Sequence, residues 1–183
     1  LLDYAINSSL VLSYVSIHKE DKAGLVTFND HFDSFIPASR RSGQMQALLE
    51  GLYQQKTSFK ETDYSALCVH LGKYLNKRSF LILYTDFDTI ASLNRQMPYL
   101  QQLARQHRLL IVFFEDAELK EQIAKAPGST EEYYQQVIAE KFAYEKRLIV
   151  STLKQHGIYS LLTTPESLSV DVINKYLEMK SNH

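Results

Sequence analysis

Residues 80–88 read Phe-Leu-Ile-Leu-Tyr-Thr-Asp-Phe-Asp, a run of apolar side chains that ends in two carboxylates. A strand that is apolar along its whole length is typical of a central parallel strand covered by helices on both faces. In open α/β sheets, ligands bind in the crevice beyond the carboxyl ends of such strands. The stretch therefore predicts a strand at 79–85 and places Asp86 and Asp88 at the edge where a functional site would form.

Helices and strands alternate along the rest of the chain, after one initial hairpin. Apolar side chains at regular spacing, capping residues and glycine or proline breakers mark the ends of each segment. The pattern predicts a mainly parallel, Rossmann-like α/β sheet with helices on both faces, in a single domain. The predicted strands are 23–28, 32–36, 79–85, 109–114 and 158–162, and the predicted helices are 1–18, 42–54, 63–76, 90–106, 116–125, 130–155 and 166–180.

Individual residues set three of these boundaries. Pro37 has no N–H to donate to a sheet, so it is expected to stop the strand at 32–36. Thr62 or Asp63 is expected to cap the helix that begins at 63, because both residue types are favoured N-caps. Gly157 is expected just past the end of the long helix, where a left-handed backbone favours glycine.

The composition is that of an ordinary globular protein, with 45% hydrophobic and 22% charged residues among 183. The formal net charge of −1 creates no overall field that would attract nucleic acid or an anionic membrane. The single cysteine, Cys68, excludes an internal disulfide and fits a reducing compartment. No apolar run reaches the roughly 18–20 residues that span a bilayer, so no membrane contact is expected from this chain.

Apart from the Asp-x-Asp of residues 86–88, no motif in the chain predicts a catalytic group, and none predicts a resident cofactor. The chain has only 6 glycines and no glycine-rich phosphate loop, so nothing points to nucleotide binding. Its 6 histidines form no cluster with the spacing of zinc ligands. We therefore expect a protein that is not an enzyme and has no resident cofactor.

Five short stretches, in this order and spacing, carry a resemblance to a known family: Leu2-Asp3-Tyr4-Ala5-Ile6-Asn7, the Asp-Lys-Ala-Gly-Leu-Val-Thr-Phe of 21–28, the Thr-Asp-Tyr-Ser-Ala-Leu of 62–67, the Tyr-Thr-Asp-Phe of 84–87 and the Asn-Lys-Tyr-Leu-Glu-Met-Lys of 174–180. They resemble the bacterial domain-of-unknown-function family fifty-eight. Its members are von Willebrand factor A-like proteins found beside MoxR-type AAA+ ATPases. The likeness covers essentially all of 1–183 and implies such a domain without its first strand, since the chain opens inside a helical pattern.

This resemblance implies a protein–protein interaction or adaptor domain that acts with a MoxR-type ATPase. In such families the domain often follows amino-terminal membrane helices. We therefore expect a cytoplasmic domain whose parent protein is anchored by such helices. The chain alone reads as a fragment of that parent.

The resemblance also implies a metal-ion-dependent adhesion site at the carboxyl edge of the sheet. Thr62 corresponds to the threonine of the family's second metal loop and Asp86 to the aspartate of its third. Hydroxyl and carboxylate oxygens suit Mg²⁺. The first loop, Asp-x-Ser-x-Ser, would lie upstream of the chain, so the chain holds a remnant of the site, and Mg²⁺ binding is expected only of a longer parent.

Two alternatives remain open for these residues. Asp86 and Thr62 could serve only as helix caps or as acceptors of backbone N–H groups. Asp86 and Asp88 could instead be the nucleophile and the acid/base of a haloacid dehalogenase-like, Mg²⁺-dependent phosphotransferase. That family's pattern has Thr or Val four residues after the first aspartate, where this chain has Ile90. The later order of its motifs also differs.

The helix predicted at 130–155 carries many large apolar residues. Helical spacing assigns most of them to the core. Tyr133, Tyr134 and Tyr144 could instead form an aromatic surface patch for a partner, because aromatic residues are enriched at interfaces.

A missing first strand would leave a gap between the hairpin and the strand at 79–85. Each backbone group left unpaired in such a gap would cost about 1–3 kcal/mol. The two halves could close up directly, a neighbouring molecule could add a strand and form a homo-oligomer, or residues outside the chain could fill the gap. We expect one of the last two outcomes.

Overall fold

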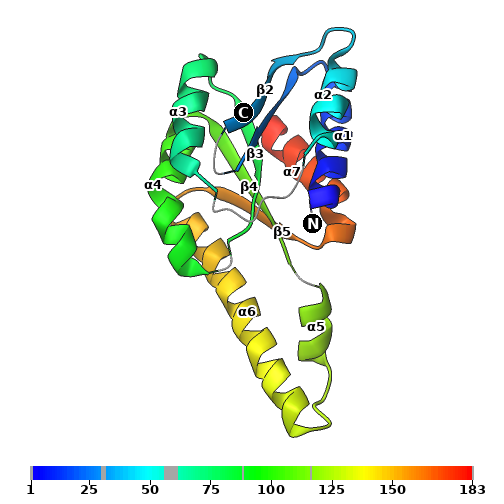
Figure 1. The fold of residues 1–183 in the computed structure, drawn as a ribbon, viewed down its shortest axis with the longest axis vertical. Coiled ribbons are helices and arrows are strands. Elements are labelled where there is room, and N and C mark those ends of the chain that lie inside the picture. Colours follow the sequence, from blue (N-terminus) through cyan, green and yellow to red (C-terminus); the bar gives the residue numbers. More distant parts are fainter. Residues whose placement is uncertain (1, 30–31, 56–61, 88, 116, 183) are drawn as a thin grey trace. The chain divides into compact units, whose positions relative to one another are not determined.

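The computed structural model describes residues 2–29, 32–55, 62–87, 89–115 and 117–182. The chain divides into two compact units (Figure 1). Unit 1 comprises Leu1–Lys77 and Glu166–His183, and unit 2 comprises Arg78–Pro165. In the described residues the fold is mixed α/β, with seven α-helices, an antiparallel hairpin and a parallel three-stranded sheet.

Unit 1 combines the hairpin with four helices. The helix α1 (Leu2–His18) packs against α7 (Leu168–Ser181), against α2 (Gln44–Tyr53) and against the strand β1 (Ala23–Phe28). The strand β2 (Phe32–Ser39) contacts α2 and α3 (Tyr64–Tyr74), and a short 3-10 turn (Pro165–Ser167) precedes α7. The buried core of the unit is mainly leucine and other aliphatic side chains, including Ile6, Leu12, Leu48, Leu52, Leu67, Leu71, Leu168 and Val172.

The strand β2 continues through Pro37, so the prediction that Pro37 ends it was wrong. Ala23 pairs with Ser39, and Leu25 pairs with Ile36. Pro37 and Ala38 therefore lie opposite Gly24 alone, which is the arrangement of a β-bulge. Proline is tolerated at such a position because the ladder makes no hydrogen bond there.

Unit 2 contains the parallel sheet, in the order β3 (Phe80–Tyr84), β4 (Arg108–Phe114) and β5 (Tyr159–Thr163). The central strand is β4, whose residues from Leu109 to Phe114 are all buried. The prediction that the strand at 79–85 is central was wrong for this sheet, because β3 lies at its edge and is mostly half-buried. The apolar character of both strands was predicted, but not which of them lies inside.

Three helices complete unit 2. α4 (Ile90–Gln106) packs on β4, and α6 (Thr130–Gln155) packs on β5 and contacts α4. α5 (Ala117–Ala124) runs beside the first half of α6, and the two form a helical hairpin that extends away from the sheet (Figure 1). Gly157 follows α6 with φ +71° and its N–H bonded to Lys154, which confirms the predicted C-terminal glycine.

The described strands form two separate sheets, since β1 pairs with β2 and the parallel ladder runs from β3 to β5. The hairpin therefore does not extend the parallel sheet. How the gap of a missing first strand is filled stays a prediction. The assignment of 1–183 to a single domain also stays a prediction.

Candidate functional site

The Asp86 side chain lies just past the end of β3 and forms an ion pair with Lys146 of α6. The Lys146 ammonium also donates to the main-chain carbonyl of Phe87, at 3.3 Å, and lies 5.6 Å from the centre of the Phe113 ring. A cation over an aromatic face is stabilised by the quadrupole of the ring. Lys146 thus links α6 to Asp86 and Phe87 after β3 and to a ring of β4.

The neighbouring residue of α6 holds the next part of the same segment. The Glu145 carboxylate accepts the Ile90 N–H, at 3.0 Å. That N–H is one of the first in α4, where a negative charge is favourable. Thr89 caps the same helix by accepting the Ser92 N–H, at 3.1 Å. Asp86, Phe87 and Ile90 are therefore held by one turn of α6, and Thr89 adds a local cap.

This arrangement gives Asp86 a partner already in place. A metal ion bound to Asp86 would share this carboxylate with the Lys146 ammonium or displace it. In the described residues, no three His, Cys, Asp or Glu side chains gather as metal ligands do. The side chains described around Asp86 thus form an ion pair that fits a structural role.

Thr62, the other residue of the predicted metal site, directly precedes Asp63 and the helix α3. Thr62 is half-buried and belongs to unit 1, whereas Asp86 belongs to unit 2. The cap of α3 is Asp63, which accepts the Ala66 N–H at 2.9 Å and the Ser65 hydroxyl at 2.7 Å. These hydrogen bonds hold the pKa of Asp63 below its usual value. Asp88, the second aspartate of the phosphotransferase alternative, lies outside the described residues. The metal role of Thr62 and Asp86 stays a prediction.

We expect the Lys146–Asp86 pair to show a coupling free energy of about 1 kcal/mol, at the upper end for ion pairs near a surface, because Lys146 is largely covered. The measurement is a double-mutant cycle of unfolding free energies with Lys146→Met and Asp86→Asn. The control is the i,i+3 helix pair Lys175–Glu178, 3.3 Å apart, whose glutamate is 59% exposed. It should couple by only a few tenths of a kcal/mol. Additive effects at Lys146 and Asp86 would contradict the structural role.

A second charged cluster joins two of the stretches that carried the family resemblance. Asp21, in the turn after α1, accepts hydrogen bonds from the Tyr176 hydroxyl and from Lys180, at 2.7 Å, both on α7. Burial alone would raise the pKa of Asp21, but these two hydrogen bonds and the charge of Lys180 lower it. The cluster ties the last helix to the first, so these residues of the resemblance have a structural role that the sequence did not indicate.

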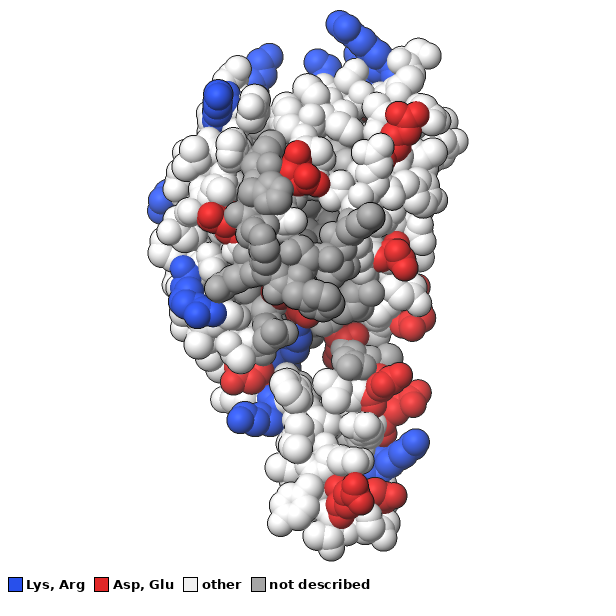
Figure 2. Space-filling model, in the orientation of Figure 1, with Lys and Arg blue, Asp and Glu red and all other residues white. Residues whose placement is uncertain are grey.

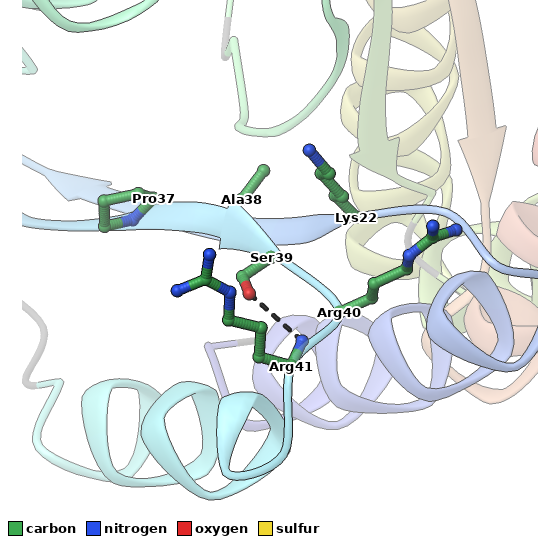
Figure 3. A pocket seen from close by; sticks show the side chains of 6 residues that line it. All are labelled: Lys22, Pro37, Ala38, Ser39, Arg40 and Arg41. Atoms are coloured by element: carbon green, nitrogen blue, oxygen red, sulfur yellow. Dashed lines mark hydrogen bonds between the residues drawn. The ribbon is translucent and has the colours of Figure 1, made fainter.

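A hollow of about 360 Å³ lies at the end of β2, lined by Lys22, Pro37, Ala38, Ser39, Arg40 and Arg41 (Figure 3). Its three cationic side chains point in different directions in Figure 3. Arg40 donates to the main-chain carbonyl of Glu20, at 2.7 Å. The hollow is positively charged, but its cations do not converge on one point as they would around a bound anion.

The most prominent surface feature of unit 2 is an apolar face on the first half of α6. Tyr134, Ile138 and Phe142 are 64%, 55% and 49% exposed. The exposed Tyr133, Val137 and Tyr144 lie beside them on the same helix. We call these six residues the α6 face. The prediction that most apolar residues of this helix are in the core was wrong for this half. Tyr133, Tyr134 and Tyr144, the residues of the alternative surface patch, are all exposed.

The fold and the contacts around Asp86 define a mixed α/β domain with a structural ion pair where a ligand site was expected. The chain belongs to the family described as "Protein of unknown function DUF58", whose model matches residues 2–123. The predicted membership is thereby confirmed. No curated protein and no solved structure matches the chain. None of the helices in the described part of the chain has both the length and the apolarity needed to cross a membrane.

Proposed function

We propose that this chain is a non-catalytic protein–protein interaction domain that binds its partner through the α6 face. The observation that supports the proposal is the exposure of six large apolar side chains on one half of one helix. Single exposed apolar residues are normal, but a contiguous group of this size is typical of an interaction site.

The family resemblance suggests the partner, a MoxR-type AAA+ ATPase, and a von Willebrand factor A-like arrangement of the sheet. The same resemblance places the domain in the cytoplasm, with its parent held by amino-terminal membrane helices. A metal-assisted contact at the carboxyl edge would require a longer parent with the first metal loop, in which Mg²⁺ would bind Thr62 and Asp86. The α6 face needs no such ion.

The rival proposal is a haloacid dehalogenase-like phosphotransferase that uses Asp86 and Asp88. The motif is incomplete here, because Ile90 stands where that family's pattern has Thr or Val. If the full chain hydrolyses an aryl phosphate with Mg²⁺, and Asp86→Asn abolishes that turnover, the rival proposal replaces ours. Absence of turnover removes the rival.

The interaction is tested with the purified MoxR-type ATPase of the same organism and two triple variants of the full chain. The patch variant carries Tyr134→Ser, Ile138→Ser and Phe142→Ser. The control variant carries the same number of changes to serine at exposed apolar residues of unit 1, namely Tyr53, Val69 and Val170. We expect the wild type and the control variant to bind equally in sedimentation velocity and the patch variant to bind at least tenfold more weakly. Equal binding by all three would overturn the role of the face.

A further inference from the structure

The α6 face has the geometry of a surface that receives another helix. Tyr134, Ile138 and Phe142 follow one another at intervals of four residues and therefore form one row along the helix. Tyr133, Val137 and Tyr144 continue the face beside that row. Two adjacent apolar rows over about three turns are what an amphipathic helix presents to a partner helix.

The opposite side of α6 is already used within unit 2. Gln136 donates to the main-chain carbonyls of Ile123 and Lys125, at 2.8 and 3.0 Å, and so joins α6 to the end of α5. Ala139 is completely buried between these contacts. Because α5 fixes this side, the apolar rows are held facing outward. A partner would meet a surface that is already ordered, which reduces the entropy lost on binding.

The charges around the face are mainly negative. Residues 115–145, which contain α5 and the exposed half of α6, include eight acidic and three basic residues. The exposed Glu131 lies one turn before the row of Tyr134, Ile138 and Phe142. The exposed Glu140 lies one turn from Val137 and from Tyr144. In residues 130–145 the only basic residue is Lys141. In Figure 2 the acidic side chains of this hairpin lie mainly on the α5 side and at its tip, with basic side chains beside them.

From this combination we propose that the α6 face binds an amphipathic helix whose apolar side is flanked by lysine and arginine. This inference rests on the proposed function and adds the chemistry of the partner. The apolar rows supply the buried contact, and the glutamates select a basic helix and raise its association rate. The apolar side of the incoming helix packs along the Tyr134–Phe142 row.

The same charges argue against two other occupants. A second copy of this chain would bring two acidic hairpins together, and like charges opposed at an interface cost several kcal/mol. An anionic membrane would be repelled by the glutamates, since basic residues provide the attraction to such surfaces. Both occupants are outcomes of the test.

The test uses two synthetic helical peptides with one shared leucine face, one with lysine and arginine flanks and the other with glutamate flanks. Binding to the full chain is measured by fluorescence anisotropy at low and high salt. We expect the basic peptide to bind at least tenfold more tightly than the acidic one at low salt, with the difference shrinking at high salt. The patch variant should lose this binding and the control variant should keep it.

A charge reversal supplies an independent readout. The double variant Glu131→Lys and Glu140→Lys changes two exposed positions. It should weaken the binding of the basic peptide and strengthen the binding of the acidic one. Equal binding of the two peptides, or no loss in the patch variant, would overturn the proposed partner chemistry. Concentration-dependent dimerisation that the patch variant abolishes would instead assign the face to a second copy. Binding to phosphatidylglycerol vesicles, lost in the patch variant, would assign it to a membrane.

The two proposals can fail separately. If the ATPase binds the α6 face and neither peptide does, the interaction function stands and the basic amphipathic helix is wrong. If the basic peptide binds the face and the ATPase does not, the partner chemistry stands and the ATPase is the wrong partner. If neither binds, both proposals fall.

Discussion

Replacing Ile149 by alanine is expected to destabilise the protein by about 2–5 kcal/mol, whereas the same change at Ile138 should alter stability by less than about 0.5 kcal/mol. Both residues lie on α6, but Ile149 is 0% exposed and Ile138 is 55% exposed. Truncating Ile149 removes buried apolar contacts and leaves a cavity. Truncating Ile138 removes a side chain that is largely in water.

The measurement is the free energy of unfolding in urea for the two variants and the wild type. The pair is matched, because the residue type, the substitution and the helix are the same. Helix propensity favours alanine over isoleucine at both positions and so cancels in the comparison. A loss at Ile138 as large as that at Ile149 would show that the first half of α6 is covered in the free protein, and it would remove the basis of the proposed function.

The change Gly24→Ala is expected to destabilise the protein by about 1–3 kcal/mol, the usual cost of overpacking. A Cβ atom on Gly24 would lie 2.6 Å from the Ile36 carbonyl oxygen and 2.7 Å from the Ala38 nitrogen. Both atoms belong to the main chain of β2, which cannot move aside without disturbing the bulge at Pro37. The close approach of the two strands thus requires glycine at this position.

Gly72→Ala is the control and should have the opposite sign. Gly72 lies within α3, and a Cβ atom there would meet nothing within 4 Å. Alanine in a helix is favoured over glycine by about 0.5–1 kcal/mol, so this variant should gain stability. Thermal unfolding of the two variants measures both effects. A neutral Gly24→Ala would show that the bulge is loose, and the account of Pro37 would then be wrong.

The sequence predicted most elements because each has a strong local signal. The apolar run at 109–114, the breaker at Gly157 and the cap at Asp63 need only their neighbours in the chain to be recognised. The boundary at Pro37 was missed because a bulge depends on how Gly24 pairs across the hairpin. The edge position of β3 was missed for a similar reason, since strand order is a property of the sheet and not of one strand.

The candidate site shows the same limit. Asp86 was recognised because a carboxylate at a strand end is a local pattern. Its partner, Lys146, is 60 residues away along the chain, and no short motif connects the two. The exposure of the α6 face could not be predicted from helical periodicity either. Periodicity shows which residues share a face of the helix, but not whether another element covers that face. The structure shows which side of α6 is covered, because Gln136 bonds to the end of α5.

The helix α6 has no glycine or proline between residues 130 and 155, so it is one uninterrupted rod. From Ile138 to Lys146 it spans about 12 Å, at a rise of 1.5 Å per residue. A load applied to the exposed half is therefore carried mechanically to the turn that holds Asp86 and the start of α4. The first half of α6, where a partner would bind, is exposed, and the other half packs against β5 and α4. Lys146 and Glu145 are the contacts through which such a load would reach the segment that follows β3.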